Sequence, residues 1–378
     1  MHERLVTRMK AQGPKKILAL DGGGIRGTIT IEVLAEIERT LREKFGRDNL
    51  LLADYFDLVA GTSTGAIIAA CVALGMTVSD IRDFYTQSGS AMFDKASILR
   101  RFRYKFDDDK LAAKLQEVFG ARTTLGSDAL RTLLMMVMRN ATTDSPWPLS
   151  NNPMAKYNLR TRADGTPRDN CNLNLPLWQL VRASSAAPAY FPPEVVKIGK
   201  REFVFVDGGI TMYNNPAFQA FIMATIEPYA VNWPASQASL LVVSVGTGAS
   251  PHANTDLTPN DMNLLYNAGS IPSALMYAAL NEQDMLCRIF GRCLVGDPID
   301  REVGDLRFSK GPSGADRMFT YLRYNAELSI EGLSRLGLSD IEPEHVQRLD
   351  SVDHIVDLQR VGQAVARCVQ ATDFNGFV

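Results

Sequence analysis

Histidine and cysteine are both scarce in this sequence of 378 residues, which holds four histidines and five cysteines. The cysteines are odd in number and form no CxxC pair, which argues against a disulfide framework and against a cysteine zinc site. The longest apolar run begins at Ala66 and is broken at Gly75, too short for a bilayer span. A net charge of -2 gives no electrostatic reason to expect a nucleic acid polymer as partner. We therefore expect a folded cytoplasmic protein with reduced thiols.

Short apolar runs alternate with helical patterns in the first two-thirds of the chain, which predicts an α/β fold with a mainly parallel central sheet flanked by helices. The expected strands cover 17–20, 55–60, 202–206 and 240–245, and the expected helices cover 28–45 and a stretch from about 66. Residues 95–175 have charge clusters and prolines, and we interpret them as a long insertion around the sheet. We assign 15–250 to a catalytic domain and 251–378 to a mostly helical C-terminal region that packs on the core or regulates it.

Gly61-Thr62-Ser63-Thr64-Gly65 is a G-x-S-x-G motif between an expected strand and an expected helix. A serine on such a sharp turn has its hydroxyl exposed at the helix N-terminus, where the helix dipole favours developing negative charge. The alternative is a glycine-rich connection in which the serine only caps the helix. The strand–turn–helix context favours a nucleophile at Ser63.

Asp21-Gly22-Gly23-Gly24-Ile25-Arg26-Gly27 also follows an expected strand and opens a helix. Successive glycines let backbone N–H groups converge on one point, as an oxyanion hole requires. A dinucleotide-binding loop would need an acidic residue about 20 positions on, at the end of a second strand. The candidate, Glu43, falls inside an expected helix, so an oxyanion hole formed by Gly22, Gly23 and Gly24 is favoured.

Asp207 ends an expected strand and is followed by Gly208 and Gly209. We expect its carboxylate at a carboxyl end of the sheet, where α/β proteins place their sites. His252 is the only histidine placed to complete a triad, and its polar loop favours solvent exposure. A carboxylate within hydrogen-bond reach can take the serine proton directly, so a Ser63–Asp207 dyad is the simpler arrangement.

The glycine loop, the serine motif and Asp207-Gly208-Gly209, in this order, resemble the patatin-like phospholipase family. The stretches 182–191, 214–216 and 241–248 also match its pattern, so that the resemblance covers about 15–250. It implies Ser63 as nucleophile, Asp207 as base and the Gly22–Gly24 amides as oxyanion hole. It further implies supporting roles for Arg26, Gly27, Gly61, Gly65, Gly208 and Gly209, and no metal or other cofactor. Arg26 could bind lipid phosphate or brace the loop.

The helical last third and the stretch 321–328 are similar to bacterial patatin-like effectors of antiphage signalling. That resemblance implies an enzyme that hydrolyses membrane phospholipid at the inner membrane after a cyclic dinucleotide binds. The aromatic and basic stretch 100–106 suits anionic headgroups or a nucleotide, or is a solvated edge. A constitutive lysophospholipase or neutral-lipid lipase, and a non-catalytic lipid- or nucleotide-binding module, remain alternatives, and a homo-oligomer is left open.

Overall fold

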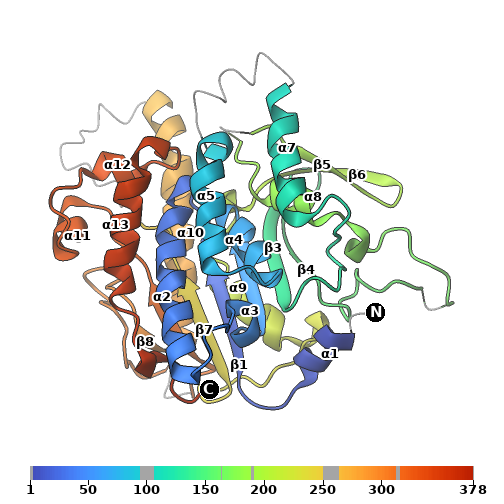
Figure 1. Ribbon diagram of the computed structural model, residues 1–378, viewed down its shortest axis with the longest axis horizontal. Helices are drawn as coiled ribbons and strands as arrows, with labels where there is room; N and C mark the ends of the chain where they lie inside the picture. Colours follow the sequence, from blue (N-terminus) through green and yellow to red (C-terminus); the bar gives the residue numbers. More distant parts are fainter. Residues whose placement is uncertain are drawn as a thin grey trace.

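The computed structural model describes residues 3–93, 106–162, 164–188, 191–249, 264–311 and 316–377. Within these ranges, helices cover both faces of a nine-stranded sheet (Figure 1). Its strands lie in the order β5-β6-β3-β2-β1-β7-β9-β8, and β4 pairs with β3 outside this path. The strands are β1 (Lys15–Leu20), β2 (Leu58–Thr62), β3 (Leu133–Asn140), β4 (Ser145–Ser150), β5 (Glu194–Ile198), β6 (Arg201–Asp207), β7 (Leu240–Val245), β8 (Gly291–Val295) and β9 (Phe319–Tyr324). The predicted mainly parallel α/β fold is confirmed, because the six strands β3, β2, β1, β7, β9 and β8 run parallel to one another.

Side chains of β1 alternate between two apolar cores, one on each face of the sheet. Leu18 and Leu20 belong to the larger core and Ile17 and Ala19 to the other, as expected for a strand that is buried on both sides. The larger core includes residues of α2, α4, α5 and α13, and α2, α5 and α13 lie in front of the sheet in Figure 1. The main helices are α1 (Glu3–Lys10), α2 (Gly27–Phe45), α3 (Leu52–Tyr55), α4 (Thr64–Ala73), α5 (Val78–Phe93), α7 (Phe106–Phe119), α8 (Leu177–Ser184), α9 (Ala217–Thr225), α10 (Leu264–Phe290), α11 (Ile330–Arg335), α12 (Pro343–Gln347) and α13 (Ile355–Ala366).

Two expectations about the middle of the chain are wrong. Residues 55–60 are not one strand: α3 ends at Tyr55 and β2 begins at Leu58. The stretch 95–175 is not an insertion around the sheet, because its apolar run forms β3, which pairs with β2 inside the sheet. β3 is parallel to β2 but antiparallel to β6, so this strand is where the sheet changes direction.

The C-terminal region is less helical than expected. It supplies β9, which pairs with β7, and β8, which pairs with β9. Its helix α13 packs along α2 (Figure 1). The division at residue 250 stays a prediction, and both parts contribute strands to one sheet.

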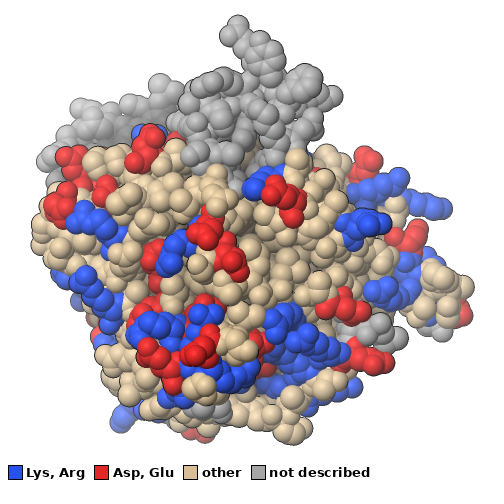
Figure 2. Space-filling view, viewed as in Figure 1, with Lys and Arg blue, Asp and Glu red and all other residues tan. Residues whose placement is uncertain are grey.

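The surface is mixed in charge. Acidic and basic residues lie side by side over most of the described face in Figure 2. On α2, for example, Arg39 forms ion pairs with Glu36 and Glu43. Among the helices of the described ranges, none has the length and apolar character needed to cross a bilayer.

Candidate active site

Ser63 lies at the turn between β2 and α4. Its backbone has φ 55° and ψ −124°, a conformation that residues with a side chain rarely adopt. The turn is tight because Gly61 and Gly65 let backbones meet: a Cβ on Gly61 would come within 2.1 Å of the Gly65 carbonyl oxygen. A Cβ on Gly65 would in turn lie 2.2 Å from the carbonyl oxygen of Leu20 on β1. The sequence therefore builds the sharp strand-to-helix turn that a nucleophilic serine requires.

The Ser63 hydroxyl donates a hydrogen bond of 2.5 Å from Oγ to Asp207 Oδ2. The other carboxylate oxygen, Oδ1, accepts the Gly209 N–H at 2.6 Å. Both side chains are buried, with Ser63 8% and Asp207 5% exposed. Burial raises the pKa of Asp207 to about 6, although the hydrogen bonds from Ser63 and Gly209 lower it. The two predicted catalytic residues thus lie in direct contact.

Asp207 reaches Ser63 from a strand that runs the opposite way. Asp207 lies at the carboxyl edge of the parallel strands, as expected, although its own strand, β6, is antiparallel to β3. β3 extends past the end of β2: Val137 pairs with Thr62, and the next residue, Met138, pairs with Asp207. Gly208 makes this approach close, because a Cβ there would lie 2.2 Å from the Val137 carbonyl oxygen.

The glycine loop lies beside Ser63. A Cβ on Gly22 would be 3.2 Å from the Ser63 Cβ. The Gly22 N–H, however, donates to the Asn214 carbonyl at 3.0 Å. The expected set of three free amides is therefore reduced, because Gly22 is already bonded. Within the described ranges no backbone carbonyl outside the helices and strands accepts the N–H of Gly23 or Gly24, so these two amides remain the candidates for the oxyanion hole.

Two hydroxyls that are not among the predicted site residues hold this arrangement. Ser184 Oγ accepts the Ser63 N–H at 3.0 Å and donates to the Val137 carbonyl at 2.5 Å. Thr247 Oγ1 donates to the Gly22 carbonyl at 2.8 Å. Both lie in stretches that match the family pattern, 182–191 and 241–248. That match is the sequence feature that could have pointed to these two residues.

Arg26 supports the glycine loop by bonding to the end of α12. Its Nη1 donates to the Gln347 carbonyl at 3.2 Å, and Ile25 N–H donates to the Leu349 carbonyl at 3.0 Å. Burial lowers the pKa of Arg26 to about 10, while Asp21 raises it, so the side chain stays charged at neutral pH. These contacts favour bracing over lipid phosphate binding. Gly27, the next residue, lets α2 pack against Thr64 of α4.

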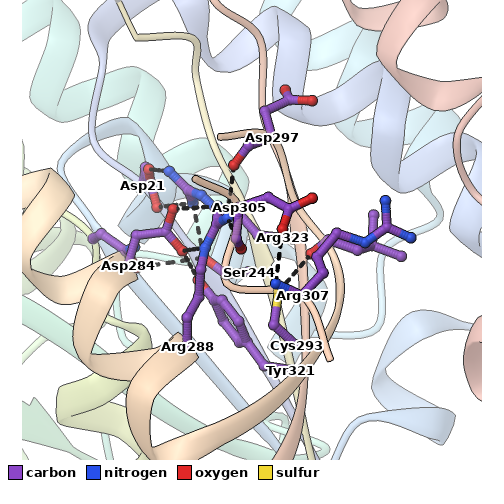
Figure 3. Close-up of polar contacts among 12 residues, drawn as sticks. Asp21, Ser244, Asp284, Arg288, Cys293, Asp297, Asp305, Arg307, Tyr321 and Arg323 are labelled. Atoms are coloured by element: carbon purple, nitrogen blue, oxygen red, sulfur yellow. Dashed lines mark hydrogen bonds and ion pairs between the residues drawn. The ribbon is translucent and has the colours of Figure 1, made fainter. Parts of the chain in front are cut away.

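A buried ion pair links the start of the glycine loop to β9. Arg323 donates to both oxygens of Asp21, at 3.0 and 2.6 Å, and to Ser244 Oγ at 2.8 Å (Figure 3). Burial opposes the charge on Arg323, but the Asp21 carboxylate outweighs it and raises the pKa of Arg323. Close by, Asp284 of α10 accepts bonds from Arg288 and from the Tyr321 hydroxyl. The C-terminal region therefore carries part of the electrostatic support of the loop.

His252 and the stretch 100–105 lie outside the described residues, so the structure places neither the candidate triad histidine nor most of the aromatic and basic stretch 100–106. In the part of the chain that is described, Ser63 Oγ has the Asp207 carboxylate as its only hydrogen-bond partner.

Residues 18–221 match the family model described as patatin-like phospholipase. The match spans the glycine loop, Ser63 and Asp207. The chain belongs to this family.

Individual members of the family match the chain at about 30% identity. The chain is 31% identical over 244 residues to a cGAMP-activated phospholipase of Vibrio cholerae, covering 61% of this chain and 64% of that protein. It is 29% identical over 244 residues to a cGAMP-activated phospholipase of Escherichia coli, at 61% and 62% coverage. Patatin-like protein 1 of Oryza sativa is 31% identical over 264 residues, at 62% and 58% coverage. The chain thus spans less than two thirds of the length of each of these relatives.

Proposed function

We propose that this protein is a serine acyl hydrolase that cleaves ester bonds of phospholipids through Ser63 and Asp207. The observation that carries the proposal is the buried hydrogen bond of 2.5 Å between Ser63 Oγ and Asp207 Oδ2 at the strained turn. Membership in the family of patatin-like phospholipases supports the same chemistry.

In the proposed reaction, Asp207 takes the Ser63 proton as Oγ attacks the ester carbonyl carbon. The carbonyl oxygen becomes an oxyanion facing the N–H groups of Gly23 and Gly24. The tetrahedral intermediate collapses, and the leaving alcohol receives the proton from Asp207. Water, deprotonated by the same carboxylate, then attacks the acyl-enzyme and releases fatty acid and free Ser63. A carboxylate whose pKa is raised to about 6 is a stronger base than an exposed one and is still ionised at neutral pH.

A change of Ser63 to Ala tests the nucleophile. We expect S63A to stay folded and to lose about a million-fold in turnover, because no other group can form the acyl-enzyme. D207N should be almost as inactive. Ser185→Ala is the matched control, because among the described residues Ser185 Oγ bonds only to carbonyls at the end of α8. Fatty-acid release from phospholipid vesicles and labelling by a fluorophosphonate are the measurements. A wild-type protein that the probe never labels would instead be a non-catalytic binding module.

The substrate class is supported by an uncharged stretch of α10 beside the site. No charged residue occurs between Leu264 and Asn281 of α10. In that stretch Ile271 is 50% and Leu275 is 64% exposed, and Met276 Cε lies 3.7 Å from where a Cβ on Gly209 would be. Exposed apolar side chains next to a dyad suit the acyl chains of a lipid surface.

Replacing both exposed residues, Ile271 and Leu275, with Asp tests this surface. We expect the double variant to lose vesicle binding and vesicle hydrolysis while hydrolysing a water-soluble p-nitrophenyl ester normally. Ile330→Asp is the control, since Ile330 of α11 is also an exposed apolar residue, at 71%. Equal loss on both substrates would mean that the helix serves folding. A preference for lysophospholipid or triglyceride over diacyl phospholipid would favour the alternative enzymes.

We further propose that a cyclic dinucleotide activates the enzyme in antiphage defence, and that it works in the cytoplasm at the inner membrane. Two relatives bear the name cGAMP-activated phospholipase. A cavity of about 380 Å³ between β8, β9 and the end of α13 offers a candidate site. Arg307, Arg323 and Arg367 line it, and guanidinium groups suit phosphates. Arg323 also bonds Asp21 at the glycine loop, so occupation of the cavity can reach the active site.

Arg367→Ala tests the activator site. We expect low basal hydrolysis that rises steeply with one cyclic dinucleotide in the wild type, and loss of that rise in R367A with the basal rate unchanged. Arg301→Ala, exposed outside the cavity, should respond normally. If the wild type is fully active alone and no cyclic dinucleotide shifts its melting temperature, the constitutive lipase is the better description.

A further inference from the structure

Two histidines and an aspartate converge at the turn between α12 and α13. His345 comes from α12, His354 from the short helical turn Val352–His354, and Asp357 from the first turn of α13. Both imidazole Nδ1 atoms lie 3.5 Å from the same oxygen, Asp357 Oδ2. One ligand atom of each residue lies within 4.8 Å of the others, and in the described ranges this is the only such group of three.

These separations are too long for good hydrogen bonds, but they bring the three ligand atoms close enough to share an ion once the rings turn. An N–H···O bond spans about 2.7–3.2 Å, so 3.5 Å is too long for a good one. In a tetrahedral site with metal–ligand bonds of about 2.1 Å, by contrast, neighbouring ligand atoms are about 3.4 Å apart. We propose that His345, His354 and Asp357 form a binding site for a divalent transition-metal ion of the zinc class, with water as the fourth ligand.

Binding requires the imidazole rings to turn. The rings are stacked, with centroids 3.7 Å apart and an angle of 13° between their planes, and an ion must lie in the plane of each ring that binds it. Both side chains are about one-third exposed, at 35%, which leaves room for rotation. Glu342 Oε2 lies 3.6 Å from His345 Nε2, the ring nitrogen that does not face Asp357, so a further carboxylate is close to the site.

Arg360 is the charged group that opposes a cation here. Its Nη1 lies 3.6 Å from Asp357 Oδ1, the oxygen that does not face the histidines. Arg360 also pairs with Asp340 at 2.8 Å, which partly neutralises it. The oxygen that faces the imidazoles therefore remains available to the ion.

The site is placed to stiffen the segment that supports the glycine loop. Its ligands lie on both sides of Gln347 and Leu349, whose carbonyls accept the bonds from Arg26 and Ile25. An ion that links α12 to α13 restricts the motion of the segment between its ligands. It therefore holds the Gln347 and Leu349 carbonyls in place. The ion would thus brace the loop from behind without touching substrate. Only this effect on hydrolysis rests on the proposed function; metal binding itself does not.

The experiment uses the full chain, stripped with a chelator, in a Cys368→Ser background because the thiol of Cys368 is exposed and can bind zinc. Zn²⁺ is titrated by calorimetry, and the melting temperature is measured with and without it. We expect one ion per chain and a higher melting temperature. Co²⁺ in place of Zn²⁺ should give the visible absorption of a tetrahedral site.

Single replacements D357N and H354A should each weaken Zn²⁺ binding by more than about tenfold, since losing even a supporting contact of a metal ligand costs about that much. D353N is the matched control, because it removes an exposed carboxylate from the same turn and should bind as the parent does. Absence of Zn²⁺ binding, or binding that D357N and H354A leave unchanged, would overturn the proposal. Fluorophosphonate labelling of Ser63 in the same samples shows separately whether the proposed hydrolase is intact.

Discussion

The backbone of Ser63 is strained. Its φ of 55° is unfavourable for a residue with a Cβ, and such conformations cost about 1–3 kcal/mol. Neither S63A nor S63G can form the acyl-enzyme or the bond to Asp207, but only S63G removes the Cβ. We therefore expect S63G to be more stable than S63A by about 1 kcal/mol, after allowing for the larger entropy of glycine in the unfolded chain. Urea unfolding measures the difference, and an S63A that equals or exceeds S63G would show that the turn is not strained.

Asp207 is a second site where function and stability conflict. An exposed aspartate has a pKa of about 3.9, whereas burial raises the pKa of Asp207 to about 6. Above pH 6 the folded protein must hold a buried charge that the unfolded chain keeps in water. As pH falls from 6 to about 4 the folded state takes up the proton first, so this penalty, about 3 kcal/mol in full, disappears.

D207N should therefore be more stable than the wild type at pH 8, by up to about 3 kcal/mol, and the advantage should vanish near pH 4. Urea unfolding at several pH values is the measurement. Hydrolysis of a soluble ester by the wild type should rise with pH and level off above about 6, because only the ionised carboxylate accepts the serine proton. A D207N protein that is less stable at pH 8 would mean that Asp207 is held by interactions worth more than its burial costs.

The Asp21–Arg323 pair joins the end of β1 to β9, and both residues are buried. Removing one partner of such a pair leaves an uncompensated charge and costs about 3–5 kcal/mol, whereas removing both is far milder. We expect R323M to be strongly destabilised and D21N with R323M to recover most of the loss. Arg335→Met is the control, because its pair with Glu327 is exposed and worth at most about 1 kcal/mol. Thermal and urea unfolding are the measurements, and an additive double variant would mean that the pair is not coupled.

The elements that sequence could predict are those with a local signal. β1, α2, β6 and β7 follow from apolar runs and helical spacing, and Ser63 and Asp207 follow from short motifs whose strand–turn context fixes their geometry. β9 was missed because Phe319–Tyr324 includes the polar residues Thr320 and Arg323. Arg323 can be buried because it pairs with Asp21, which is about 300 residues away in the sequence and so gives no local signal.

The same reason explains the error at the glycine loop. Three glycines predict converging amides, but whether each amide is free depends on neighbours that the motif does not contain. Gly22 is bonded by the Asn214 carbonyl, which belongs to a different loop. Similarly, β3 was missed because the methionine-rich run 133–138 has no clear strand periodicity, and its place between β2 and β6 is decided by long-range pairing.

The sheet contains strands from both sides of residue 250. β7 lies between β1 and β9, so a chain that ends at 250 would expose one edge of β7. It would also uncover the side of α2 that packs against α13 and leave Asp21 buried without Arg323. Exposed edges and apolar faces favour aggregation, and the lost charge pair adds a further cost.

We therefore expect residues 1–250 alone to aggregate or to lack a cooperative unfolding transition, even though they contain Ser63, Asp207 and the glycine loop. Co-expression with 264–378 as a second chain should restore a soluble complex, because the sheet and the α2–α13 contact can re-form across the break. Gel filtration, near-ultraviolet circular dichroism and hydrolysis of a soluble ester are the measurements. A fragment 1–250 that is monomeric, unfolds cooperatively and hydrolyses the ester would establish it as an independent domain. The C-terminal region would then pack on a core that already folds without it. The contacts of Arg323 and of the segment around Leu349 would not be needed for hydrolysis.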